Sequence, residues 1–230
     1  MPPAAPPFRA IPQDDPDTLY AQRTDPASAQ RAVQVWAARL AANGRDFESA
    51  WKLARARYWL GTHGADTDRK SNLDAGITAG RAAIAVEPNR PEGHFWVAAN
   101  MGALAESFGL RQGLKYRGDI RAELETVLRL EPAFQQGSAD RALGRWYFKV
   151  PGLFGGSTQK SEEHLRKSLI YNPNSTVSLY FLAETLIDEK KKDEARALLT
   201  RAIEAPLDPE WTPEDNDFKQ KARRLMREIQ

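Results

Sequence analysis

Cysteine is missing from all 230 residues of the sequence. Its absence excludes disulfide bonds, thiolate zinc sites and cysteine nucleophiles. The sequence also lacks an apolar run of about 18 residues, so we expect no membrane-spanning segment. An excess of one charge is lacking as well, since the net charge is +2, and a nucleic-acid interface is not expected. Sustained alternation of apolar and polar residues is nearly absent, which argues against strands.

Catalytic patterns are missing too. No G-x-S-x-G segment occurs, and His63, His94 and His164 lie far apart without a second ligand at metal spacing. The glycine-rich stretch KVPGLFGGSTQK is not a phosphate loop, because Gly152 and Gly156 stand one residue too close and no lysine follows. We therefore expect no enzyme, no metal site and no cofactor.

The beginning of the sequence is rich in proline, with five prolines in the first 12 residues. This composition predicts an extended leader over residues 1–25. Asp25 and Pro26 then have the residue types of a helix start, and Asn43-Gly44 those of its end. From residue 26 to 230 we expect a single helical domain.

Four helices of this domain are expected to end at the same kind of sequence, in which a proline follows the helix. The segments are AIAVEPN, VLRLEPA, LIYNPN and AIEAPLD, with Pro88, Pro132, Pro173 and Pro206 spaced 44, 41 and 33 residues apart. The last spacing is close to that of tetratricopeptide repeats (TPR), which are stacked helix pairs. The predicted fold is an all-α, TPR-like α-solenoid of about four helix pairs, with capping helices at both ends. The expected units are 46–88, 91–132, 137–173 and 175–206, and the final capping helix is 213–229.

The three longer units carry extra residues between their two helices. These insertions are GTHGADTDRKSN, SFGLRQGLKYRG and KVPGLFGGST, and in a parallel stack they are expected at one rim. In the third, Pro151 is expected to stop a helix, the glycines to form a bend, and Ser157 or Thr158 to cap the next helix. Elaborated loops on one face of a repeat array favour a binding face there.

Aromatic residues are numerous on the expected first helices and near this rim. Helix-spaced aromatic side chains most often belong to the core, and that interpretation stays beside the functional one. The functional one takes them as the wall of an apolar groove or pocket. The candidate binding residues are Trp59, His94, Phe95, Trp96, Asn100, Arg145, Trp146, Phe148, Leu153 and Phe154.

Several of these segments resemble a known family. EPNRPEGHFWVAANMGALAESFGL and RALGRWYFKVPGLFGGSTQKSEEHLRKSLIYNPNS are similar to the T component of tripartite ATP-independent periplasmic (TRAP) transporters, and more loosely to the TPR-like regulators of microtubule dynamics. The resemblance covers roughly residues 46–206 and rests on the H-x-W-x-A-x-x-x-G element that starts at His94 and on PGLFGGS (151–157). It implies a periplasmic, often lipid-anchored helical protein that associates with a solute-binding protein.

Two functions follow as hypotheses. The first is a periplasmic helper that docks a solute-binding protein and holds a small apolar or organic-acid ligand in a deep, aromatic-lined pocket beneath the insertions. The second is a general TPR scaffold, periplasmic or cytoplasmic, that binds a peptide in an open groove with carboxylate-clamping side chains. Both are non-enzymatic, and both leave homo-oligomerisation open.

Overall fold

The protein is helical throughout residues 15–229, the part of the chain that this computed structural model describes. No strand occurs in that range. The elements in chain order are α1 (Pro16–Ala21), α2 (Pro26–Ala42), α3 (Phe47–His63), α4 (Asp66–Val86), α5 (Pro91–Ser107), α6 (Leu110–Leu130), α7 (Ser138–Lys149), the 3-10 turn η1 (Gly152–Phe154), α8 (Thr158–Tyr171), α9 (Thr176–Asp188), α10 (Lys192–Glu204) and α11 (Thr212–Glu228).

The second helix of each pair ends where the prolines predict. α4, α6, α8 and α10 end at Val86, Leu130, Tyr171 and Glu204, each two residues before its proline. The residue before a proline is disfavoured in helical conformation, so the helix stops there. The predicted all-α, TPR-like solenoid is confirmed.

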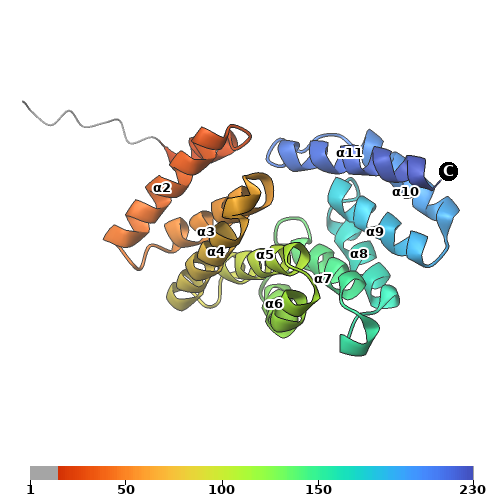
Figure 1. The fold of residues 1–230 in the computed structure, drawn as a ribbon, viewed down its shortest axis with the longest axis horizontal. Coiled ribbons are helices and arrows are strands. Elements are labelled where there is room, and N and C mark those ends of the chain that lie inside the picture. Colours follow the sequence, from red (N-terminus) through yellow and green to blue (C-terminus); the bar gives the residue numbers. More distant parts are fainter. Residues whose placement is uncertain (1–14, 230) are drawn as a thin grey trace, which may run out of the picture.

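The helix pairs stack into an arc (Figure 1). The first helices α3, α5, α7 and α9 contact one another along the inner side, and the second helices pack behind them. α11 packs against α9 and α10 and lies across the open side of the arc. The inner side is called the concave face below, and the side formed by α4, α6 and α8 is called the outer face.

Residues 15–25 differ from the predicted extended leader. The Asp15 carboxylate accepts hydrogen bonds from two backbone N–H groups of the first turn of α1, at 3.4 and 3.1 Å. Tyr20 of this short helix is buried and its ring lies 5.9 Å from that of Trp36. An Asp-Pro start therefore forms a helix here, as it does at residue 25, and the prediction was wrong for this part. Residues 1–14 of the predicted leader lie outside the described residues.

Two of the three predicted insertions extend helices instead of forming loops. α3 runs to His63 and α4 begins at Asp66, so only two residues separate them. The acidic first turn of α4 favours a helix start at that point. α5 likewise ends at Ser107 and α6 begins at Leu110, with Gly109 at a φ of 80° turning the chain.

The third insertion has the predicted construction. α7 ends at Lys149, and η1 follows Pro151. Gly155 adopts a φ of 104°, a conformation that glycine enters without steric cost. The Ser157 hydroxyl then accepts a hydrogen bond from the Lys160 backbone N–H at 3.2 Å and caps α8. The helix stop, the glycine bend and the cap are confirmed.

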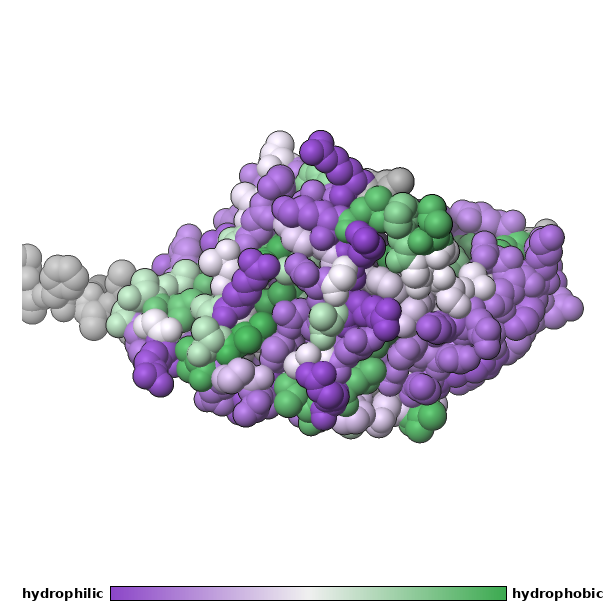
Figure 2. Space-filling model, turned by 90° about the horizontal axis from the view of Figure 1, so that it is seen from below, coloured by the Kyte–Doolittle hydropathy of each residue, from purple (hydrophilic) through white to green (hydrophobic). Residues whose placement is uncertain are grey.

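The core has two parts of different composition. From α1 to α7 it is rich in aromatic side chains, including four buried tryptophans: Trp36, Trp59, Trp96 and Trp146. From α8 to α11 it consists of leucine, alanine and isoleucine, including Leu165, Leu182 and Leu199. Seen from the outer face, the surface is mostly hydrophilic, with separate hydrophobic patches on its left and middle and right of its centre (Figure 2). The large aromatic side chains thus stabilise the stack rather than cover its outside.

Candidate functional site

Two of the predicted binding tryptophans are core residues whose indole N–H groups also hydrogen-bond to the backbone of other segments, the α1–α2 connection and α6. Trp59 is buried and its indole Nε1 donates a hydrogen bond to the carbonyl of Arg23 at 2.8 Å. Trp146 is buried and its Nε1 donates to the carbonyl of Arg117 at 3.0 Å. A buried indole N–H normally finds such a partner, so both side chains are explained by packing.

The predicted group at the start of α5 is buried as well. Asn100 is fully buried and its amide donates to the carbonyls of Ala54 (3.1 Å) and Trp96 (2.7 Å), which ties α5 to α3. Phe95 and Trp96 pack edge to face, with ring centroids 5.1 Å apart. These side chains hold the repeats together and present no wall to a ligand.

His94 belongs to the interface between two helices. Its Nδ1 lies within hydrogen-bond distance of the Glu123 carboxylate, and its Nε2 lies 2.9 Å from the carbonyl of Pro88. The hydrogen bond to Glu123 raises the pKa of His94 above its usual value of 6.5, against the effect of partial burial. His94 therefore connects α5 to α6 through a charge-assisted contact.

Leu153 and Phe154 are the predicted residues that do reach the surface. Leu153 is 90% exposed and Phe154 is 38% exposed, both on η1. The Arg117 guanidinium lies 5.7 Å from the centre of the Phe154 ring. Leu153 thus projects from the rim, whereas more than half of the Phe154 side chain is covered.

Arg145 and Phe148 lie half-buried on α7, at the concave face. The Arg145 guanidinium donates to Glu106 of α5 at 2.9 Å and to Glu184 of α9 at 2.6 Å. It also lies 4.5 Å from the ring centre of Phe181. Three successive first helices are thereby connected by one arginine, and each of its acidic partners is 39 residues away in the sequence.

Arg141, one turn before Arg145, is the residue that the sequence analysis missed. Its side chain makes no hydrogen bond or ion pair with any residue in the range 15–229, although it is half-buried. Burial lowers its pKa to about 10, and Tyr58 of α3 and Asp215 of α11 oppose that change. Arg145, four residues further along α7, contacts Glu106 of α5 and Glu184 of α9, so Arg141 lies on the same side of the helix, toward the concave face.

Aromatic residues lie beside the neighbouring Arg145, on the same side of α7. Burial raises the pKa of Tyr58 and of Tyr180 to about 12 each, so both phenols stay neutral at ordinary pH. Phe218 of α11 packs against Tyr180 and Phe181 of α9, at 5.5 and 5.4 Å between ring centroids. We call Tyr58, Arg141, Arg145, Tyr180 and Phe181 the concave cluster. It combines an unpaired cation with neutral aromatic surface.

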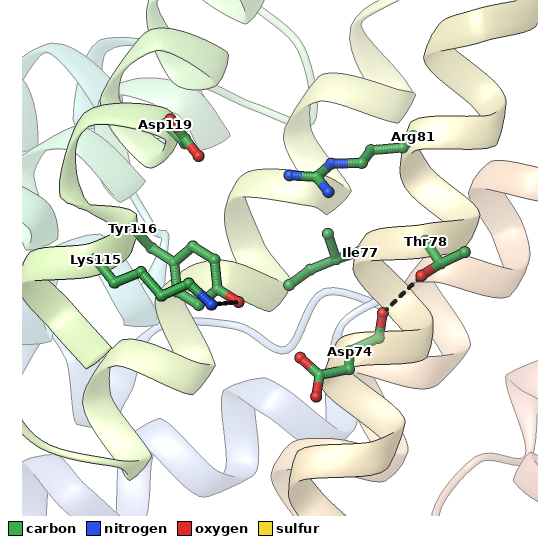
Figure 3. A pocket seen from close by; sticks show the side chains of 7 residues that line it. All are labelled: Asp74, Ile77, Thr78, Arg81, Lys115, Tyr116 and Asp119. Carbon is green, nitrogen blue, oxygen red and sulfur yellow. Dashed lines mark hydrogen bonds between the residues drawn. The ribbon is translucent and has the colours of Figure 1, made fainter. Parts of the chain in front are cut away.

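An open pocket of about 340 Å³ lies on the outer face between α4 and α6 (Figure 3). Its lining residues are Asp74, Ile77, Thr78, Arg81, Lys115, Tyr116 and Asp119. Two acidic and two basic side chains balance one another, and both basic ones are exposed. The pocket therefore has no charge preference that would select one class of ligand.

Metal and membrane sites were also sought in the described part of the chain. Within residues 15–229 no three histidine, aspartate or glutamate side chains form a group suited to a metal ion. None of the helices in that range has the length and apolar character needed to cross a bilayer. The concave cluster is therefore the candidate site.

The comparisons with known proteins agree with this fold. A family model described as "Regulator of microtubule dynamics protein 1-3" matches residues 14–154. The chain belongs to this family. The part that matches the regulator family runs from α1 to η1 and contains all ten predicted binding residues. A search of curated proteins finds no significant match.

Solved structures resemble nearly the whole chain. One is TTC0263, a thermophilic TPR protein of Thermus thermophilus, with a TM-score of 0.67, 21% identity and coverage of 92% of this chain and 97% of that one. Another is MamA, with a TM-score of 0.55, 15% identity and coverage of 92% and 99%. At such identities the likeness shows the TPR-like fold alone. The T component of TRAP transporters is not among these matches, and that resemblance stays a prediction.

Proposed function

We propose that this member of the regulator family is a non-enzymatic protein-interaction scaffold. It holds a peptide segment of a partner protein on the concave face, with a carboxylate of that segment bound to Arg141. The name of the family refers to the regulation of microtubule dynamics, and a scaffold could act in such a role by binding proteins. A stacked helix-pair array suits this work because its inner side is long and continuous.

The observation that carries the proposal is the unpaired guanidinium of Arg141 beside aromatic side chains. Its neighbour Arg145 on the same helix is fully engaged by two carboxylates, so acidic side chains can reach this depth of the concave face. Arg141 lacks such a partner, and its charge is partly desolvated. A ligand carboxylate would form charge-assisted hydrogen bonds there, and Tyr58 and Tyr180 would contact its apolar neighbours.

Selection of peptides from a random library on the full-length protein tests the proposal. The enriched peptides are expected to contain acidic residues. A charge-assisted hydrogen bond contributes about 1.5–3 kcal/mol, so Arg141→Met is expected to weaken binding roughly 10- to 100-fold. Arg81→Met on the outer face is the matched control and should leave binding unchanged. Equal binding to wild type and Arg141→Met would refute the proposal.

A second candidate comes from the resemblance to TRAP transporters: a periplasmic helper that holds a small organic acid. The same guanidinium favours it, because a free organic acid offers the same carboxylate to Arg141. The aromatic pocket expected beneath the insertions is not its basis, since Trp59, Trp96 and Trp146 are packed in the core. Native mass spectrometry of the purified protein separates the candidates, because a co-purified acid that Arg141→Met releases would favour the helper. Periplasmic location stays a prediction, which a fractionation experiment can test.

A further inference from the structure

The two ends of the arc meet in a cleft that lies apart from the concave cluster. α1 and α3 form one side of this cleft, and the segment 209–216 before and at the start of α11 forms the other. Its volume is about 470 Å³. Two arginines, Arg23 and Arg55, stand in it, and their surroundings differ.

Arg23 has all the partners that a buried arginine requires. It is 4% exposed, and its Nε and Nη2 donate to the two carboxylate oxygens of Glu214 at 3.2 and 2.6 Å. Nη2 also donates to the carbonyl of Glu210 at 2.8 Å. Its guanidinium lies 5.0 and 5.1 Å from the ring centres of Tyr20 and Trp59. This arginine joins the C-terminal segment to the N-terminal helices.

Arg55 is buried to a similar extent, but its side chain makes no hydrogen bond within residues 15–229. It is 8% exposed, and its Nε is enclosed without a partner. The nearest carboxylate oxygens, of Asp17 and Glu210, are 3.9 and 3.8 Å from its terminal nitrogens. Those distances are too long for hydrogen bonds. Ring centres of Tyr20 and Trp51 lie 4.1 and 5.1 Å from the guanidinium, so its faces are covered and its edge is left for a ligand.

We propose that Arg55 is the centre of a second binding site, which takes a carboxylate from an acidic peptide segment of a partner protein. A planar guanidinium binds a carboxylate through two parallel hydrogen bonds, and this is the interaction that Arg55 lacks. The cleft beside it has room for a side chain, and Pro209 and Pro213 line it. The proposal goes beyond the concave-face function, because the site uses no residue of the concave cluster.

The neighbouring charges favour a carboxylate over a phosphate. Asp17 and Glu210 both lie within 4 Å of Arg55, and a dianion would be repelled by both more strongly than a monoanion. Lys52 holds Asp17 at 2.9 Å, whereas the Glu210 carboxylate is 65% exposed and has Arg55 as its ion-pair partner among residues 15–229. Glu210 is therefore the internal competitor that an incoming acidic residue would replace.

The chain supplies a suitable probe, because its own segment 207–216, LDPEWTPEDN, already lies against the two arginines. A fluorescein-labelled peptide of this sequence is titrated with the full-length protein, and the anisotropy is measured. Glu210→Gln removes the competitor and is expected to strengthen binding several-fold. Arg55→Lys keeps the charge but loses the planar fork, and is expected to weaken binding by ~10-fold. Arg81→Lys, on the outer face, should change nothing.

Two further measurements keep the outcome unambiguous. Thermal unfolding of each variant shows that the protein is folded, and a peptide with both glutamates replaced by glutamine should lose affinity. Arg141→Met serves as a second background that separates this site from the concave cluster: with the concave-face arginine removed, Arg55→Lys should still weaken binding of the probe by ~10-fold. If the probe does not bind wild type or Glu210→Gln, or if Arg55→Lys binds it as well as wild type, the proposal is wrong. If Arg141→Met alone abolishes binding, the peptide occupies the concave face instead, which also overturns it.

Discussion

Arg141→Met should make the protein more stable while it weakens ligand binding. The pKa of Arg141 is lowered to about 10 because the charged form is desolvated. A group with a lowered basic pKa opposes folding at every pH at which it is charged in both states, and this includes neutral pH. At about 1.4 kcal/mol per pH unit, full desolvation would correspond to about 3 kcal/mol. Solvent reaches part of the side chain, and we therefore expect a gain of about 1–2 kcal/mol.

Methionine is suited to this test because it has a similar length and fills the same space without a charge. The measurement is urea-induced unfolding at neutral pH, followed by far-UV circular dichroism. Arg145→Met is the matched control on the same helix. It leaves Glu106 and Glu184 without their partner, so it should lose about 1 kcal/mol or more. The two substitutions are thus expected to shift the unfolding midpoint in opposite directions.

The reasoning fails if Arg141→Met lowers the unfolding midpoint as Arg145→Met does. Such a result would mean that Arg141 is stabilised by the folded protein and is not waiting for a ligand. A midpoint equal to that of wild type would show that water already solvates the charge. A ligand carboxylate would then gain no extra binding free energy from Arg141, and the proposal would be contradicted. Opposite shifts of the two unfolding midpoints, together with weaker peptide binding by Arg141→Met, would support both the desolvation of Arg141 and its role in binding.

Three further outcomes are expected. Stability should fall as pH rises above 6.5 and through the raised pKa of His94, since its charged contact with Glu123 is then lost; His94→Gln should remove that slope in urea midpoints measured over a pH series. Gly76→Ala should destabilise the protein by about 1–3 kcal/mol in thermal unfolding, because the new Cβ would lie 2.2 Å from a buried amide oxygen. The double substitution of Leu153 and Phe154 by serine should change the free energy of unfolding by less than about 0.5 kcal/mol. A larger loss of stability would show that these side chains pack on the core.

The helix ends could be predicted from sequence because their causes are local. A proline two residues after each second helix and an Asp-Pro or Ser cap act within a few residues. The same local reasoning misjudged the first two insertions. There the residues between helices include good helix formers and an acidic first turn at Asp66, and these outweigh Gly61 and Gly64 as loop signals.

The site could not be predicted in the same way. Arg141 and Arg145 are both arginines on one helix, four residues apart, and nothing local distinguishes them. Their difference arises from Glu106 and Glu184, each 39 residues from Arg145. Acidic residues about one repeat before and one repeat after an arginine are a sequence signal that could have predicted ion pairs with that arginine. The burial of most aromatic candidates agrees with the core interpretation, since stacking of successive pairs buries large side chains between them.

Four buried or half-buried arginines can be compared within this one chain. Arg23 and Arg145 each meet two carboxylate oxygens at hydrogen-bond distance, so the fold is able to satisfy a guanidinium both where the ends of the arc meet and in the middle of the stack. Arg55 and Arg141 stand beside acidic and aromatic residues and form no hydrogen bond in the described chain. Leaving a desolvated charge without a partner opposes folding. A carboxylate of a ligand would therefore gain more binding free energy at these two arginines than at Arg23 or Arg145. This difference is the reason that both proposed sites are expected to bind acidic ligands.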